Sequence, residues 1–151
     1  MKITIINRSE FILDKDALKG VCDWLGEEID LDYGAVSLVF VDDGEISRLN
    51  EKFYHREGIT DVLAFPYEEE AEIFLNPYQH RRQASEFGNS FSQETVENII
   101  HALLHLAGYD HTEAGDRQHL KLQKTLMGKF EKKETGAVIA VENETGNSGE
   151  M

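Results

Sequence analysis

Apolar residues recur along the chain at two spacings, and these spacings predict an alternation of strands and helices. Short runs rich in β-branched and aromatic residues, bounded by polar or turn-forming residues, are typical of strands. We expect strands at about Lys2–Asn7, Ala35–Val41, Thr60–Phe65 and Glu72–Leu75. The second run is apolar throughout, which favours a buried strand. Pro66 is expected to stop the third strand, because proline lacks the N–H that a sheet requires.

Apolar residues spaced three and four apart predict about five helices, and most of these begin at a residue suited to capping. The expected helices are about Asp14–Ile29, one starting at Asp42 or Asp43, Asn76–Phe87, one capped by Ser90 or Ser92, and one from Thr112 to about Lys132. Pro77 suits the first helical position after the Asn76 cap, and Gly88 is expected to end that helix.

The interleaved strands and helices predict a single α/β (α+β) domain over residues 1–133, with a small mixed sheet packed against about five helices. From Glu134 onward the chain is rich in Gly, Glu, Asn, Thr and Ser. Such a composition disfavours a packed core, so we expect residues 134–151 to form a disordered acidic tail. The apolar stretch Ala137–Val141 is the exception within it.

Composition narrows the class of protein. A hydrophobic content of 40% is ordinary for a soluble globular chain. No apolar run approaches the roughly 20 residues that span a membrane, so we expect no membrane partner. The single cysteine, Cys22, cannot form an internal disulfide, which favours a cytoplasmic location. We expect Cys22 to pack as a small hydrophobe on the first helix.

The net charge of −14 argues against a general nucleic-acid-binding surface, since such surfaces are usually basic. The densest acidic run, Glu68–Glu72, is interpreted as a solvated loop. Basic residues gather only locally, so composition alone does not suggest RNA.

The most informative segment is His101-Ala-Leu-Leu-His105-Leu-Ala-Gly108-Tyr-Asp-His111. Two histidines four apart lie on the same face of a helix, one turn from each other. Gly108 can end that helix in the left-handed conformation, and a turn there could bring His111 round to the first two. Three neutral imidazoles with one open position are the pattern of a catalytic zinc centre.

The apolar residues of the same helix place these histidines away from the core. Its apolar stripe is formed by Val96, Ile99, Ile100, Leu103 and Leu104. At about 100° per residue, His101 and His105 point roughly 150° from the middle of that stripe. We therefore expect both to lie on an open face. The sequence also contains His80 and His119, which we interpret as surface histidines.

Metzincin metalloproteases share this spacing, as H-E-x-x-H-x-x-G-x-x-H. Ala102 occupies the position of their glutamate, which is the general base of those enzymes. Alanine cannot accept a proton, so peptidase activity is disfavoured. Asp110 is a candidate base in its place.

The chain resembles the YbeY family of endoribonucleases and rRNA maturation factors. The family motif H-G-x-L-H-L-x-G-Y-D-H is similar to the histidine segment above. The family block L-N-x-x-Y-R…P-T-D-V-L-S-F-P is similar to Leu49-Asn50-Glu-Lys-Phe53-Tyr54…Ile59-Thr60-Asp61-Val62-Leu63-Ala64-Phe65-Pro66. The resemblance covers roughly residues 35–130.

This resemblance implies one zinc ion per chain, bound by His101, His105 and His111. It also implies cleavage of single-stranded RNA in the maturation and quality control of small-subunit (16S) rRNA. The partners would be rRNA and the small ribosomal subunit, together with a ribosomal protein or a GTPase.

Departures from the family pattern concern the phosphate-binding side of the site. Many members have an arginine directly after the aromatic residue of the Leu-Asn block, where this chain has Tyr54. Arg56 lies two residues further on and could supply the cation, because a guanidinium binds two phosphate oxygens at once. Arg56 and Asp110 are therefore our candidate catalytic residues. Asp110 could also orient a histidine ligand.

Two other functions remain open. One is a non-catalytic ribosome-assembly factor with a structural zinc, which Tyr54 and the acidic charge would favour. The other is a metal-dependent hydrolase of peptides or other small substrates. Thr60 and Asp61 are interpreted as turn residues at the start of a strand, with a role facing RNA or the metal ligands as the alternative.

Overall fold

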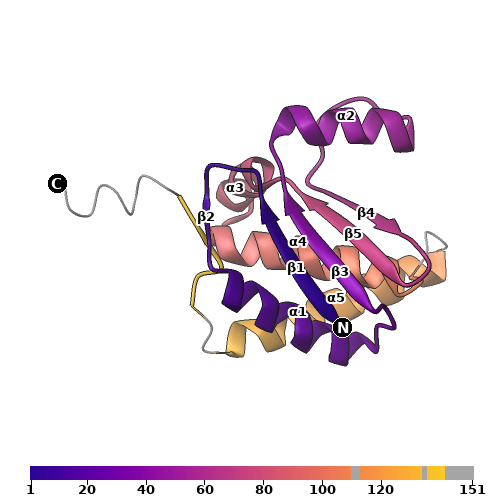
Figure 1. The fold of residues 1–151 in the computed structure, drawn as a ribbon. Coiled ribbons are helices and arrows are strands. Elements are labelled where there is room, and N and C mark those ends of the chain that lie inside the picture. Colours follow the sequence, from indigo (N-terminus) through magenta and orange to yellow (C-terminus); the bar gives the residue numbers. More distant parts are fainter. Residues whose placement is uncertain (110–112, 134–135, 142–151) are drawn as a thin grey trace.

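A four-stranded mixed sheet organises the molecule, a computed structural model that describes residues 1–109, 113–133 and 136–141 (Figure 1). The strand order is β1 (Lys2–Asn7), β3 (Ala35–Phe40), β5 (Glu70–Leu75) and β4 (Val62–Pro66). The first three strands are parallel, and β4 pairs antiparallel with β5 at one edge. The mixed α/β architecture is thus confirmed.

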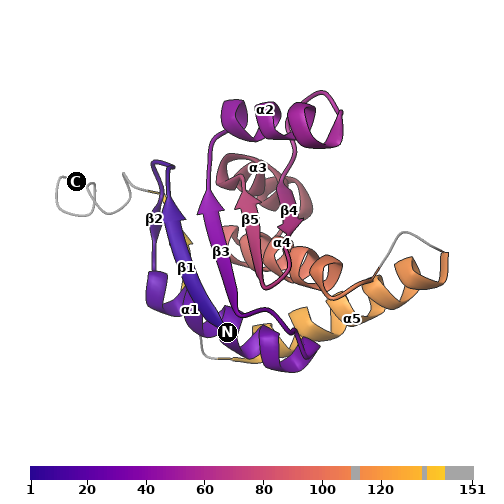
Figure 2. The same ribbon diagram turned by 45° about the vertical axis from the view of Figure 1, so that its right-hand side comes forward.

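Five helices in the described residues surround this sheet: α1 (Lys15–Ile29), α2 (Asp43–Tyr54), α3 (Pro77–Phe87), α4 (Phe91–Leu106) and α5 (Glu113–Lys132). Figures 1 and 2 show α1, α4 and α5 gathered on one face of the sheet. On β3, Leu38 and Phe40 belong to the main core, whereas Val39 packs with Ile46 of α2, as does Val41 directly after the strand. Because successive strand side chains point to opposite faces, α2 covers the other face.

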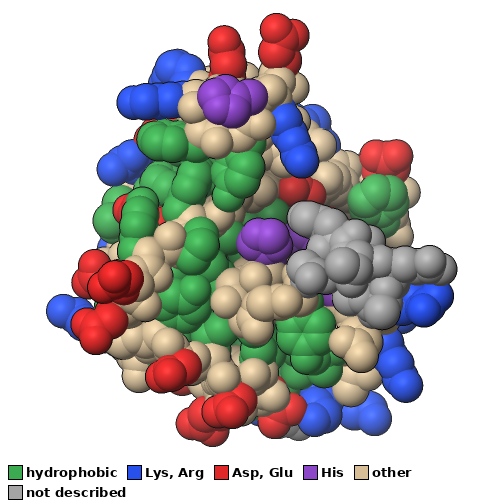
Figure 3. Space-filling model, turned by 90° about the vertical axis from the view of Figure 1, so that its right-hand side faces the viewer, with side chains coloured by type: hydrophobic (Ala, Val, Ile, Leu, Met, Phe, Trp, Pro, Cys, Tyr) green, Lys and Arg blue, Asp and Glu red, His purple; other side chains and the backbone are tan. Residues whose placement is uncertain are grey.

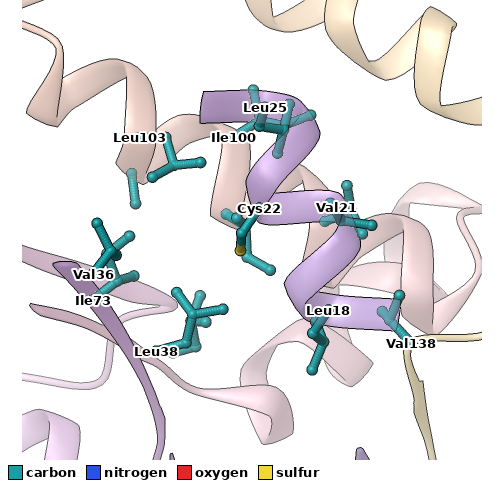
Figure 4. Packing of buried hydrophobic residues seen from close by; sticks show 14 of the residues in the cluster. Leu18, Val21, Cys22, Leu25, Val36, Leu38, Ile73, Ile100, Leu103 and Val138 are labelled. Carbon is teal, nitrogen blue, oxygen red and sulfur yellow. The ribbon is translucent and has the colours of Figure 1, made fainter. Parts of the chain in front are cut away.

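The main core is formed between the sheet and α1 and α4 (Figure 4). Val21 and Leu25 of α1 belong to the same cluster of buried residues as Ile100 and Leu103 of α4. Cys22 is buried among these residues, as expected for a small hydrophobe. Burial raises the pKa of its thiol to about 12, so the sulfur stays protonated.

Side-chain caps define where the helices begin. Asp14, Asp42 and Asn76 each accept a hydrogen bond from the first turn of α1, α2 and α3. Ser90 forms a reciprocal capping box with Gln93 and so begins α4, which settles the choice between Ser90 and Ser92. Gly88 ends α3 in the left-handed conformation. The predicted Thr112 cap lies outside the described residues.

Two of the predicted strands begin at other residues than expected. Strand β4 begins at Val62 rather than Thr60, because its partner strand β5 ends at Leu75, opposite Val62, and Asn76 then caps α3. The Asp61 carbonyl still accepts a hydrogen bond from the Asn76 N–H. Strand β5 begins at Glu70 rather than Glu72, so the acidic run is not entirely a loop. Ala71 faces the core there, and Glu70 and Glu72 on either side of it point to the opposite face of the sheet, because successive side chains of a strand alternate between the two faces.

The apolar stretch near the carboxyl end is part of the packed structure. Strand β6 (Ile139–Ala140) pairs antiparallel with β2 (Ile12–Leu13), and Val138 is fully buried in the core. The Val138 N–H donates to the Ser92 hydroxyl at 3.0 Å. The packed part of the chain therefore extends beyond residue 133. Residues 134–135 and 142–151 of the predicted tail lie outside the described residues.

Candidate metal centre

Helix α4 packs one face against the sheet and presents two histidines on its other side. The stripe predicted from the sequence is completely buried, with Val96, Ile99, Ile100, Leu103 and Leu104 all at 0% exposure. His101 is exposed and His105 is half-buried. The predicted open face of α4 is thus present in the structure.

The end of α4 has the predicted left-handed turn. The helix stops at Leu106, and Gly108 has a φ of 99°. A side chain is strained at such a φ, which accounts for glycine at this position. The Gly108 N–H donates to the His105 carbonyl at 3.1 Å, and the chain leaves the helix axis here.

The third predicted ligand, His111, and the candidate base, Asp110, lie outside the described residues. Among the residues that the structure describes, no three His, Cys, Asp or Glu side chains form a group that could hold a metal. The described part of the chain therefore places two imidazoles of the predicted zinc centre, and the zinc itself remains a prediction.

His101 and His105 line a cleft of about 370 Å³ together with Arg56, Asp61 and the start of β4. Figure 3 shows a face with exposed histidine side chains, where apolar side chains gather beside one histidine and acidic side chains are spread around the rim. The two histidines and Arg56 come from segments more than forty residues apart in sequence, and the fold brings them to one cavity.

Tyr54, which stands where many family members have arginine, is fixed to the sheet. Its hydroxyl donates to the Ala64 carbonyl at 2.5 Å, and its ring packs on Phe65 with centroids 5.4 Å apart. Burial raises the pKa of Tyr54, so the phenol remains neutral. Tyr54 therefore anchors the cleft wall and brings no positive charge to it.

Arg56 follows the end of α2 and is exposed at the cleft. His55 caps the helix in the left-handed conformation, with a φ of 53°, which turns the chain toward the cavity. Asn50 holds this turn from both sides, since its carbonyl accepts from the Arg56 N–H and its amide donates to the Gly58 carbonyl. The loop thus carries a cation to the cleft that contains both histidines.

His80 is not the surface histidine that we predicted, because it is fully buried beneath the cleft. Its Nε2 lies 3.0 Å from the Asp61 carbonyl, which can only accept, so this nitrogen carries the proton. Its Nδ1 then accepts from the Thr95 hydroxyl at 3.2 Å. Burial lowers the pKa of His80 to about 4, and the ring is neutral at pH 7.

Thr60 and Asp61 directly precede β4, as the interpretation as turn residues required, and they also line the cleft. The Asn76 amide donates to the Thr60 carbonyl at 3.2 Å. The Asp61 carboxylate accepts from the Gln83 amide at 3.1 Å, and Asp61 also lines a second cleft of about 400 Å³, which includes His101. His80 and Asn76 thus fix the backbone between two cavities that share His101.

His119 is also placed differently from the prediction. It is 7% exposed, and its Nε2 lies 2.9 Å from Nδ1 of His101. No spacing in the sequence relates the two, because the approach of α5 to α4 depends on the path of the chain after Gly108. The spacing of four residues between His119 and Gln123 does place them on one face of α5.

The fold is a small α/β domain in which two candidate metal ligands lie on the open face of α4, at a cleft. A family model described as endoribonuclease YbeY matches residues 5–131. The chain therefore belongs to the YbeY family of endoribonucleases, which confirms the resemblance seen in the sequence motifs. No described helix is long and apolar enough to cross a membrane.

Individual relatives agree with this assignment. An endoribonuclease YbeY from Lacticaseibacillus casei is 28% identical over 148 residues, which cover 86% of this chain and 97% of that protein. One from Thermotoga neapolitana is 34% identical over 121 residues, covering 73% and 81%. The fold is also similar to a solution structure of a Thermotoga maritima protein, with a TM-score of 0.59, 28% identity and coverage of 88% and 94%.

The depressed pKa of His80 predicts a specific loss of stability in acid. Unfolding returns the ring to a pKa near 6.5, so the unfolded chain binds the extra proton first. The contribution of the neutral His80 ring to the free energy of unfolding is fully present above pH 6.5. It is lost as the pH falls to about 4, and the total loss is roughly 3 kcal/mol. Urea unfolding from pH 7.5 to 4 should therefore show a shallower pH dependence for His80→Gln than for the wild type. Equal slopes would contradict this assignment, and His55→Asn controls for loss of a histidine.

Proposed function

We propose that this chain is a zinc-dependent endoribonuclease that cleaves single-stranded RNA in the maturation and quality control of small-subunit (16S) rRNA. The observation that carries the proposal is the meeting of His101, His105 and Arg56 in one cleft. Two potential metal ligands and a phosphate-binding cation together suit a phosphodiester substrate.

The chemistry of the donor set fits zinc. Imidazole is a preferred zinc ligand, and the two histidines lie one helical turn apart. Nδ1 of His101 is engaged with His119 and Gln123, which leaves Nε2 as the nitrogen for a metal. His111 would complete the set. When bound, zinc would supply Lewis acidity that stabilises negative charge developing on a phosphoryl oxygen.

The protein side chains have distinct proposed roles around that ion. The Arg56 guanidinium would bind and orient the scissile phosphate. Asp110 would act as a general base or would orient a ligand histidine. The Asp61 loop, held by His80 and Asn76, would form the wall that aligns the strand against these groups.

The acidic charge of the whole chain bears on how RNA reaches the cleft. A net charge of −14 opposes non-specific association of the chain with RNA phosphates. The positive charge of Arg56 at the cleft attracts phosphate only locally. We therefore propose that a protein partner on the small ribosomal subunit, a ribosomal protein or a GTPase, delivers the chain to its rRNA. The assembly-factor alternative shares this partner but lacks the cleavage step.

Cleavage of a single-stranded 16S rRNA precursor fragment tests this proposal directly. Zinc-loaded wild type should cut it and should spare the same segment in a duplex. We expect His105→Ala to lower the rate at least about 100-fold, because a Lewis acid supplies several kcal/mol of transition-state stabilisation. His55→Asn should cut like the wild type, because His55 is exposed and asparagine also adopts the left-handed conformation of this cap. A wild type that binds zinc and ribosomal particles without cutting would favour the assembly factor.

Arg56 gives a second, independent prediction. Removing the charge-assisted hydrogen bonds in Arg56→Ala should lower kcat/KM for RNA cleavage about 10- to 100-fold, and Arg56→Lys should fall between that variant and the wild type. Arg81 is also exposed but borders a different cavity, so Arg81→Ala is the matched control. Equal rates for the two alanine variants would remove Arg56 from the site.

A further inference from the structure

Four polar side chains form a connected group between helices α4 and α5. Glu97 and His101 are four residues apart on α4, and His119 and Gln123 are four residues apart on α5. Each pair therefore lies one turn apart on one helical face. Direct hydrogen bonds join the two pairs, so the four side chains form one network across the helix interface.

The distances give this network a direction. The Gln123 amide nitrogen lies 3.3 Å from a Glu97 carboxylate oxygen, and a carboxylate accepts hydrogen bonds. The Gln123 carbonyl oxygen consequently points away from Glu97. It lies 3.3 Å from Nδ1 of His101 and 3.2 Å from Nε2 of His119. An acceptor oxygen is thus presented to the two facing ring nitrogens.

The histidine pair then has a limited set of proton positions. Nδ1 of His101 and Nε2 of His119 are 2.9 Å apart, so one of them donates and the other accepts. A metal binds a ring nitrogen that carries no proton, which requires the His101 proton to be on Nδ1 if Nε2 takes the metal. A proton on Nδ1 of His101 has two acceptors within reach, the Gln123 carbonyl oxygen and Nε2 of His119.

We propose that His119 is a positioning residue, which together with Gln123 and Glu97 holds the His101 ring in the tautomer and orientation that bind metal. This inference rests on the proposed zinc-dependent function. The packing agrees with it, since the two rings lie with centroids 4.5 Å apart at an angle of 52°, and Tyr109 packs edge-on against His119. In this role His119 would act through His101 rather than on the substrate.

The affinity of the full chain for Zn²⁺, measured by competition with a chelator, is the first test. His119→Phe keeps an aromatic ring in place but removes both nitrogens, and Gln123→Leu removes the bridging amide. Each should weaken zinc binding about 10- to 100-fold, as expected when the partner of a ligating histidine is lost. Gln118→Leu, at an exposed position on the same helix, should bind like the wild type.

The protonation of the His101 ring is the second test, and it needs no metal. Long-range ¹H–¹⁵N NMR of the metal-free chain should show the His101 proton on Nδ1 in the wild type and in Gln118→Leu. The proton should become shared between the two nitrogens in His119→Phe and Gln123→Leu. A merely structural role for His119 would leave this signal unchanged. Unchanged zinc affinity and an unchanged tautomer in a folded variant would overturn the proposal.

Two further outcomes separate this inference from the function on which it rests. Loss of zinc in His119→Phe as complete as in His101→Ala would make His119 a ligand and would overturn its positioning role. If the wild type bound no stoichiometric zinc, the proposed function would fail. The NMR comparison would then decide alone whether His119 sets the His101 tautomer.

Discussion

The packing of α4 against the sheet is the interaction on which the rest of the structure depends. Five aliphatic residues of this helix are fully buried. Only one rotation of the helix about its own axis turns this apolar stripe toward the core. That rotation determines which residues stay accessible, and it places His101 and His105 at the cleft. The chemistry of the site is thus oriented by hydrophobic burial on the opposite side of the same helix.

The other side chains of the site are held by polar contacts that converge on this helix. His80 of α3 and Asn76, which caps this helix, fix the backbone before β4. The Thr95 hydroxyl of α4 bonds the remaining nitrogen of the His80 ring. From α2, Asn50 fixes the loop that carries Arg56. From α5, His119 and Gln123 reach His101. Buried polar groups lose free energy when unpaired, so these contacts favour one arrangement of the loops around the cleft.

Local sequence predicted the elements well and their mutual contacts poorly. The caps Asp14, Asn76 and Ser90 and the turn at Gly108 follow from chemistry within a few residues, and each is present in the structure. His80 and His119 were misjudged because their burial depends on contacts with residues distant in sequence, at Asp61 and His101. The exposed position of Arg56 at the cleft likewise depends on a left-handed cap at His55. Histidine adopts this conformation more often than most residues do, but too rarely for the sequence to predict it.

The central claim is that the open face of α4 supplies imidazole ligands to a zinc ion. X-ray absorption at the zinc K edge of the zinc-loaded chain tests it most directly, because the spectrum reports the type and number of ligands. We expect three imidazole nitrogens at about 2.0–2.1 Å from the zinc in the wild type, and fewer nitrogens, or no bound zinc, in His105→Ala. Zinc bound without imidazole, or a spectrum that His105→Ala and His101→Ala leave unchanged, would contradict it.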